Sequence, residues 1–175
     1  MTELDDFRVR KDHFFAHDAR SPLTPDQHAD FQGLAYFPEN PALRIEADLD
    51  TNVEPGEVRL QTSTGDEQAH RRAGTIRFEV DGEPAVLTLF ASEETDELFL
   101  PFRDSTTGKE TYPAGRYLDV EPAVDGKVVV DLNFAYNPYC AYNPHWSCPL
   151  PPVENWLKVP IRAGEKDFGT ARLGP

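Results

Sequence analysis

The chain has 175 residues, of which 39% are hydrophobic and 11% aromatic, which is enough apolar side chain for one domain with its own hydrophobic core. Its formal net charge of −14 repels phosphate backbones and anionic lipid surfaces, and this argues against nucleic-acid and membrane partners. The sequence has no apolar run of about 20 residues and begins without the apolar centre of a signal peptide, so we expect a cytoplasmic protein.

Two short helices are predicted at the start of the chain. Thr2 followed by Asp5 resembles a capping box, which is typical of a helix N-terminus, and Ser21-Pro22 ends the helix that follows. Four apolar residues share one face of this helix: Leu4, Phe7, Phe14 and Phe15. Thr24-Pro25-Asp26-Gln27 is a second helix start, with Gly33 as the stop signal. We therefore predict a helical arm over residues 1–33.

From about residue 42 the pattern changes to that of β-strands. Residues 43–49 and 76–80 alternate between apolar and polar side chains, as a half-buried strand does. Asp81-Gly82 follows the second of these runs and leads into AVLTLFA, which is the pattern of a β-hairpin.

Four further strand candidates follow in the second half of the chain. They are ELFLPF (97–102), GRYLDVE (115–121), KVVVDLNF (127–134) and WLKVPIR (156–162). Gly164-Glu165-Lys166 indicates a turn after the last of them. Short strands separated by turns, without helices between them, predict an all-β fold: an antiparallel β-barrel or β-sandwich over residues 42–166 in a single domain of 1–175.

Asp125-Gly126 marks a second hairpin, and its pairing would bring three polar residues together on one face. A two-residue turn at this point would place Leu118 opposite Asn133, so that Arg116 shares a face with Asp131 and Asn133. Polar groups on an otherwise apolar inward face would orient a ligand inside a barrel. The alternative is that this face meets solvent.

The most unusual segment is a proline-rich loop at residues 135–152, AYNPYCAYNPHWSCPLPP. It repeats the tetrapeptide Ala-Tyr-Asn-Pro, and its five prolines exclude a helix. Both cysteines, a histidine and one of the two tryptophans lie within it. Functional residues are often carried on stiff loops of this kind, so we predict a site here. The alternative is a rigid cover that closes one end of the barrel.

The chain resembles domain-of-unknown-function family 1684. The stretches that carry the resemblance are KDHFFAHDARSPL (11–23), FQGLAYFP (31–38), LFLPFRDSTTGKETYPAGRYLD (98–119), VVVDLNFAYNPYCAYNPHWSCPLPPVEN (128–155) and VPIRAGEK (159–166). The resemblance implies a bacterial or archaeal protein and brings no activity, substrate or catalytic residue with it. His13, His17 and His145 lie outside the signature of the family, which weighs against a mechanism built on histidine.

The balance of charged residues predicts a halophilic source. Only five of the 17 basic residues are lysines, and aspartate slightly outnumbers glutamate. Such a surface suits a very salty cytoplasm, because salt screens the mutual repulsion of the carboxylates. A haloarchaeal member of the family is therefore expected, and the charge then reflects habitat and says nothing of the substrate.

Three residues of the proline-rich loop suit metal or nucleophile chemistry: Cys140, His145 and Cys148. All three are zinc ligands, although structural zinc sites usually take four ligands, often at closer spacing than Cys-x7-Cys. Alternatively Cys140 is a nucleophile with His145 as its base, or the two cysteines form a disulfide. The pattern favours two structural thiols over each of these readings, and it assigns no cofactor.

The leading hypothesis is a binding module for a small molecule, with an anion as one option. Arg103 and Arg116 would hold the charge, since the guanidinium fork matches carboxylate and phosphate, unless both pair with neighbouring carboxylates instead. Tyr112 and Tyr136 would form walls, and Asn133 and Asn137 would orient the ligand. The alternatives are a hydrolase that uses Cys140 or a Cys/His-bound metal, and a structural or protein-interaction domain. The sequence has no motif of the serine-hydrolase, zinc-protease, P-loop or dinucleotide-binding classes.

Overall fold

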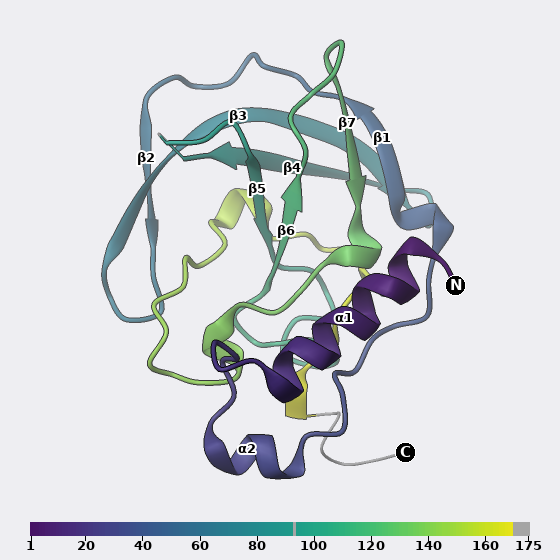
Figure 1. Cartoon of the computed structure of the whole chain (residues 1–175). Coiled ribbons are helices and arrows are strands. Elements are labelled where there is room, and N and C mark those ends of the chain that lie inside the picture. The colour runs from purple at the N-terminus through teal and green to yellow at the C-terminus, as the bar shows by residue number, and fades with distance from the viewer. Residues whose placement is uncertain (93, 170–175) are drawn as a thin grey trace.

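The computed structural model describes residues 1–92 and 94–169 and has an all-β, antiparallel architecture, as the sequence predicts. Five strands form a curled half-barrel in the order β2-β3-β4-β5-β6, and a two-stranded sheet of β1 and β7 stands beside it (Figure 1). Their bounds are β1 Arg44–Asp48, β2 Glu57–Gln61, β3 Glu67–Val80, β4 Glu83–Ala91, β5 Leu98–Phe102, β6 Arg116–Val120 and β7 Lys127–Asp131. The described residues also contain four short 3-10 helices: η1 Pro41–Leu43, η2 Leu132–Phe134, η3 Tyr139–Ala141 and η4 Val153–Asn155.

Both N-terminal helices form where their caps predict them. Helix α1 spans Glu3–His17, and its capping box joins Thr2 and Asp5 in both directions. Helix α2 spans Pro25–Asp30 and begins with a capping box between Thr24 and Gln27. No helix in residues 1–92 and 94–169 is long and apolar enough to cross a membrane.

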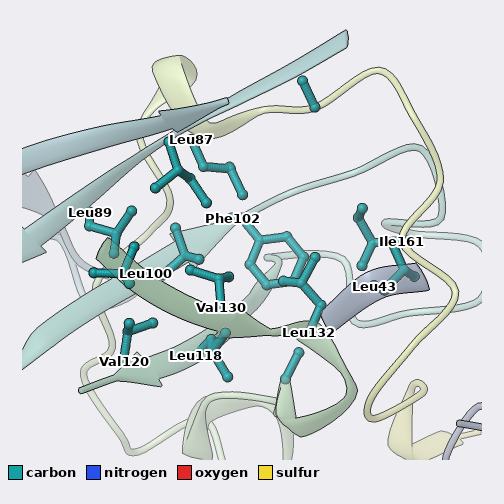
Figure 2. Packing of buried hydrophobic residues seen from close by; sticks show 14 of the residues in the cluster. Leu43, Leu87, Leu89, Leu100, Phe102, Leu118, Val120, Val130, Leu132 and Ile161 are labelled. Atoms are coloured by element: carbon teal, nitrogen blue, oxygen red, sulfur yellow. The ribbon is translucent and has the colours of Figure 1, made fainter. Parts of the chain in front are cut away.

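The apolar core lies between the half-barrel and the β1–β7 sheet (Figure 2). Side chains from β3, β4, β5, β6 and β7 meet there with residues from three non-strand segments: η1, residues 132–135 and residues 159–163. The labelled members of this cluster are Leu43, Leu87, Leu89, Leu100, Phe102, Leu118, Val120, Val130, Leu132 and Ile161. A second, smaller cluster fastens α1 to the proline-rich loop through Phe15 and Tyr142, whose ring centroids are 5.0 Å apart.

The Asp81-Gly82 hairpin is confirmed, whereas the pairing predicted around Asp125-Gly126 is wrong. Val80 faces Glu83 across the first turn, and both turn residues have the positive φ that a tight hairpin needs. The second turn also forms, but its flanking strands enter different sheets: β6 pairs with β5 and β7 with β1. Pro122 follows β6 and has no N–H for a continued ladder. The predicted face of Arg116, Asp131 and Asn133 is therefore not assembled.

The segment WLKVPIR is not a strand. Trp156 makes a single bridge to Arg103, and the following residues hold no ladder. Pro160 removes a donor, and the Ile161 N–H donates to the Asp104 carboxylate at 2.6 Å. Sequence reasoning also missed β2 and the first half of β3, whose residues are mostly exposed and polar. The first half of β3 lacks the apolar alternation on which strand prediction depends, and the edge strand β2 has only Val58 and Leu60 to show it.

The Arg116 side chain on β6 holds residues 161–165 in place although this segment belongs to no strand. Its guanidinium is 1% exposed and donates to the carbonyl oxygens of Ala163 at 2.5 Å, Ile161 at 2.8 Å and Glu165 at 3.2 Å. Asp104, fully buried, lies 3.5 Å away as the counter-ion. A buried cation with a charge partner and several acceptors fixes the backbone that supplies those acceptors.

We predict that Arg116→Met lowers the free energy of unfolding by about 3 to 5 kcal/mol, because it leaves Asp104 and three carbonyl groups buried without their donor. Urea unfolding followed by circular dichroism measures this loss. Arg77→Gln is the matched control, since Arg77 is exposed on β3 and should change stability by less than about 0.5 kcal/mol. Equal effects of the two substitutions would show that Arg116 is not a structural cation.

Candidate functional site

The separation of β6 from β7 leaves a cleft in the wall of the half-barrel, which we call the seam cleft. It has a volume of about 690 Å³, and Glu3 and Phe7 from the first half of α1 line one side of it. Its lining carries five carboxylates and two cations: Glu3, Glu46, Asp119, Glu121, Asp131, Arg44 and Lys127. A cleft with this balance does not favour an anionic ligand.

A second cavity of about 400 Å³ lies between α1 and the proline-rich loop, and we call it the helix pocket. It is lined by five aromatic residues and two cations: Phe7, Phe14, Phe15, Tyr136, Tyr139, Arg10 and Lys11. Phe7 and Tyr136 also line the seam cleft, so the two cavities adjoin across this pair. The helix pocket thus combines apolar walls with positive charge.

Lys11 reaches the helix pocket from the buried side of α1. Its Nζ lies 2.7 Å from Glu165 Oε2, 5.0 Å from the Tyr136 ring centroid and 5.6 Å from that of Phe15. The Lys11 side chain is 15% exposed and that of Glu165 only 1%. Burial of the ion pair between aromatic rings strengthens its attraction and makes the loss of either partner costly.

Glu165 is the centre of a buried polar network beneath this pocket. Besides Lys11, its carboxylate accepts hydrogen bonds from the Tyr142 hydroxyl and from the Asn137 backbone N–H at 3.2 Å. Gly164 allows this placement, because its φ is +76° and a Cβ there would lie 2.6 Å from the Ala135 carbonyl oxygen. The chain thus bends at Gly164, and Glu165 pairs with Tyr36 in an antiparallel bridge, where the sequence predicts a turn; this placement delivers a buried anion to α1.

Tyr136 stands at the boundary between the two cavities. Its backbone makes a two-way bridge with Tyr117 on β6, and its hydroxyl donates to Asp119 Oδ2 at 2.8 Å. Burial, followed by the negative charge of Asp119, raises the pKa of the Tyr136 phenol. The phenol therefore stays neutral and acts as a fixed wall between the cavities.

The other predicted ligand residues have contacts within the protein, although Arg116 Nε and Asn137 Oδ1 are buried without a hydrogen-bond partner in the described part of the chain. Asn133 bonds both the N–H and the carbonyl of Asn40, and the Asn137 side-chain amide donates to the Lys166 carbonyl at 2.9 Å. The Arg103 guanidinium lies 4.4 Å from the Trp156 ring centroid, whereas Arg116 bonds residues 161–165. The two arginines thus have separate partners, and neither lines the helix pocket.

The two cysteines come together, and His145 lies apart from them. The Cys140 N–H donates to Cys148 Sγ at 3.4 Å, and the Tyr112 hydroxyl donates to Cys140 Sγ at 3.6 Å. Both thiols are free, and His145 is exposed, with its backbone N–H bonded to Asn143. In residues 1–92 and 94–169, no three His, Cys, Asp or Glu residues are arranged to hold a metal ion.

Comparison with known proteins gives the kinship of the chain. The sequence pattern of the family described as "Protein of unknown function (DUF1684)" matches residues 29–166. The chain belongs to the DUF1684 family. No curated protein matches it. Among solved structures it is similar to the solution NMR structure of the uncharacterized protein from gene locus rrnAC0354 of Haloarcula marismortui. The identity is 41%, with 94% of this chain and 92% of that chain covered and a TM-score of 0.72.

The DUF1684 match covers Glu165 and the proline-rich loop but begins after α1, which supplies Lys11 and most of the helix pocket. Sequence reasoning missed Lys11 and Glu165 as site residues. One signal was available: Lys11 lies four residues from both Phe7 and Phe15, so it shares their apolar helix face. A charged residue on a buried face requires a buried partner, but the pattern does not say which carboxylate this is.

We predict that Lys11→Met and Glu165→Gln each lower the free energy of unfolding by about 3 kcal/mol, because each leaves a buried partner unpaired. The double variant should lose at least about 1 kcal/mol less than the sum of the two single losses. Urea unfolding of all four proteins measures this coupling. If the loss in the double variant equals the sum of the two single losses, the Lys11–Glu165 ion pair does not hold α1 to residues 164–166.

Proposed function

We propose that this DUF1684 protein is a binding module for a small molecule with a flat apolar body and one anionic group. The observation that carries the proposal is the lining of the helix pocket, five aromatic residues with Arg10 and Lys11 and no carboxylate. Its volume of about 400 Å³ falls within the range of ligand pockets. The apolar body would lie against the rings, and the seam cleft would accept any part that extends past Tyr136.

Segregation of charge supports an anionic ligand. The chain carries a net charge of −14, yet, among the described residues, the only charged ones that line the helix pocket are two cations, whereas carboxylates outnumber cations by five to two in the adjoining seam cleft. Lys11 is already neutralised by Glu165, so its charge offers little net attraction. Arg10 is exposed, and in the described part of the chain only its Nε has a partner, the Asp6 carbonyl. Arg10 is therefore the residue that would meet the anion.

The proposal is tested with two fluorescent probes that share the anilinonaphthalene ring system. One, 8-anilinonaphthalene-1-sulfonate, carries a sulfonate, and the other, N-phenyl-1-naphthylamine, is uncharged. Both should bind the native protein. Arg10→Gln should weaken the sulfonate about tenfold, or about 1.4 kcal/mol, and leave the neutral probe unchanged. Phe7→Ala should weaken both, because it removes a shared wall. Titrations are read by fluorescence in the lowest salt that keeps the protein folded.

Arg59→Gln controls for the change in net charge, since Arg59 is exposed on β2 and does not line the pocket. It should leave both affinities unchanged. Equal weakening by Arg10→Gln and Arg59→Gln would reduce the effect to overall charge. Failure of both probes to bind a fully folded protein would reject the helix pocket as a binding site.

We also propose that the protein works in the salt-rich cytoplasm of a halophile. The similar Haloarcula marismortui structure, the net charge of −14 and the scarcity of lysine support this. Its melting temperature should rise steeply between 0.1 and 2 M KCl, as screening relieves carboxylate repulsion within a Debye length of about 10 Å at the lower concentration. Thermal unfolding followed by circular dichroism measures this, and a flat salt dependence would contradict the halophilic assignment.

A further inference from the structure

The proline-rich loop carries a second chemical feature, independent of the helix pocket. The loop brings its two cysteines into contact although eight positions separate them. Cys140 lies in η3, and its backbone N–H is 3.4 Å from the Cys148 sulfur. The chain contains these two cysteines only, and both are free thiols. A sulfur held this close to the backbone of another cysteine is within reach of its thiol.

Both residues are fixed by neighbours on other elements. Cys148 is anchored through its backbone to Ser63 in the turn between β2 and β3, with its N–H 3.1 Å from Ser63 Oγ and its carbonyl 2.9 Å from the Ser63 N–H. Cys140 is approached by the Tyr112 hydroxyl at 3.6 Å. The pair is therefore held together by tertiary contacts as well as by the stiffness of the loop.

The two sulfurs differ in access and in environment. Cys140 is half-buried, whereas Cys148 is 7% exposed. Hydrogen bonds from the Cys148 thiol, and then from Tyr112 and Ser63, lower the pKa of Cys140 to about 6. The pKa of Cys148 is raised, chiefly because its proton is shared with Cys140. The direction of the two shifts favours the thiolate on Cys140 and the thiol on the less exposed Cys148.

We propose that Cys140 and Cys148 form a hydroperoxide-reactive dithiol, in which Cys140 attacks and Cys148 resolves. The Cys140 thiolate attacks the terminal oxygen of ROOH: the S–O bond forms, the O–O bond breaks, and the alkoxide leaves and takes a proton from water to give ROH. Cys140 is thereby oxidised to sulfenic acid by two electrons, and the peroxide is reduced. Cys148 loses its proton and attacks the Cys140 sulfur, and hydroxide leaves with that proton as water. Two equivalents of a low-molecular-weight thiol then reduce the protein disulfide by thiol–disulfide exchange and leave as their own disulfide.

The tyrosines around Cys140 do not ionise in the pH range in which its thiol does, so they do not complicate the assignment of the thiolate. Tyr112 and Tyr117 are the phenols that interact with the two sulfurs, and burial raises the pKa of both. They are therefore neutral across the range in which Cys140 ionises. Asp167 faces Tyr112, and its negative charge also raises the pKa of that phenol. Cys148 is the other group that titrates with Cys140.

To test the proposal, the folded wild-type protein is treated with hydrogen peroxide and its remaining thiols are alkylated. The intact mass is then measured under denaturing conditions. Oxidation should remove two hydrogen atoms and give an intramolecular disulfide. The rate should follow a single ionisation with a midpoint near pH 6, well below the value of about 8.5 for an ordinary cysteine. Tyr112→Phe should move the midpoint upward, because it removes a donor to the thiolate.

Two matched variants distinguish the attacking cysteine, Cys140, from the resolving cysteine, Cys148. Cys148→Ser should stop at the sulfenic acid of Cys140, trapped by dimedone and located by peptide mass mapping, and should form no intramolecular disulfide. Cys140→Ser should give no dimedone adduct while the protein stays folded. Thiols that react only after unfolding, a first adduct on Cys148, or a rate midpoint near pH 8.5 would each overturn the proposal. Probe binding to the helix pocket is a separate readout, so failure of one proposal leaves the other standing.

Discussion

The Arg116 guanidinium holds residues 161–165 against β6, and the arrangement of the candidate site follows from that contact. Three carbonyl groups of the segment accept its hydrogen bonds, and buried Asp104 balances its charge. The segment therefore needs no strand partner, and it ends at Glu165, directly beneath α1. One buried cation on a strand thus sets the position of a buried anion, which in turn pairs with Lys11 and holds the helix over both cavities.

The open seam between β6 and β7 gives the half-barrel a candidate binding surface. A closed barrel of this size would fill its interior with side chains, whereas an unpaired edge leaves room for a cleft. The polypeptide covers that edge with α1 and with the bridge between Tyr117 and Tyr136. Charge divides across Tyr136, with carboxylates in the seam cleft and cations in the helix pocket. The proline-rich loop serves both proposed chemistries, since Tyr139 lines the pocket and Cys140 follows it in η3.

Local chemistry accounts for the parts of the fold that sequence reasoning predicts well. Capping boxes at Thr2 and Thr24 need only residues three positions apart, and the Asp81-Gly82 turn needs only two residues that tolerate positive φ. The candidate site is harder, because its members come from distant parts of the chain. Of the predicted ligand residues Tyr136 alone lines the cavities, while Lys11 and Glu165, 154 residues apart, went unrecognised.

The sequence by itself determined the all-β class, the two capped helices, the net charge of −14 and the family to which the chain belongs. These depend on composition, on spacing within a few residues and on contiguous motifs. Tertiary structure alone decided that β6 and β7 separate, that Arg116 is a buried cation and that Lys11 meets Glu165. In each case the interacting residues lie far apart in the chain. Which of them pair depends on which buried charges and backbone groups obtain a hydrogen-bond or charge partner when the layers pack.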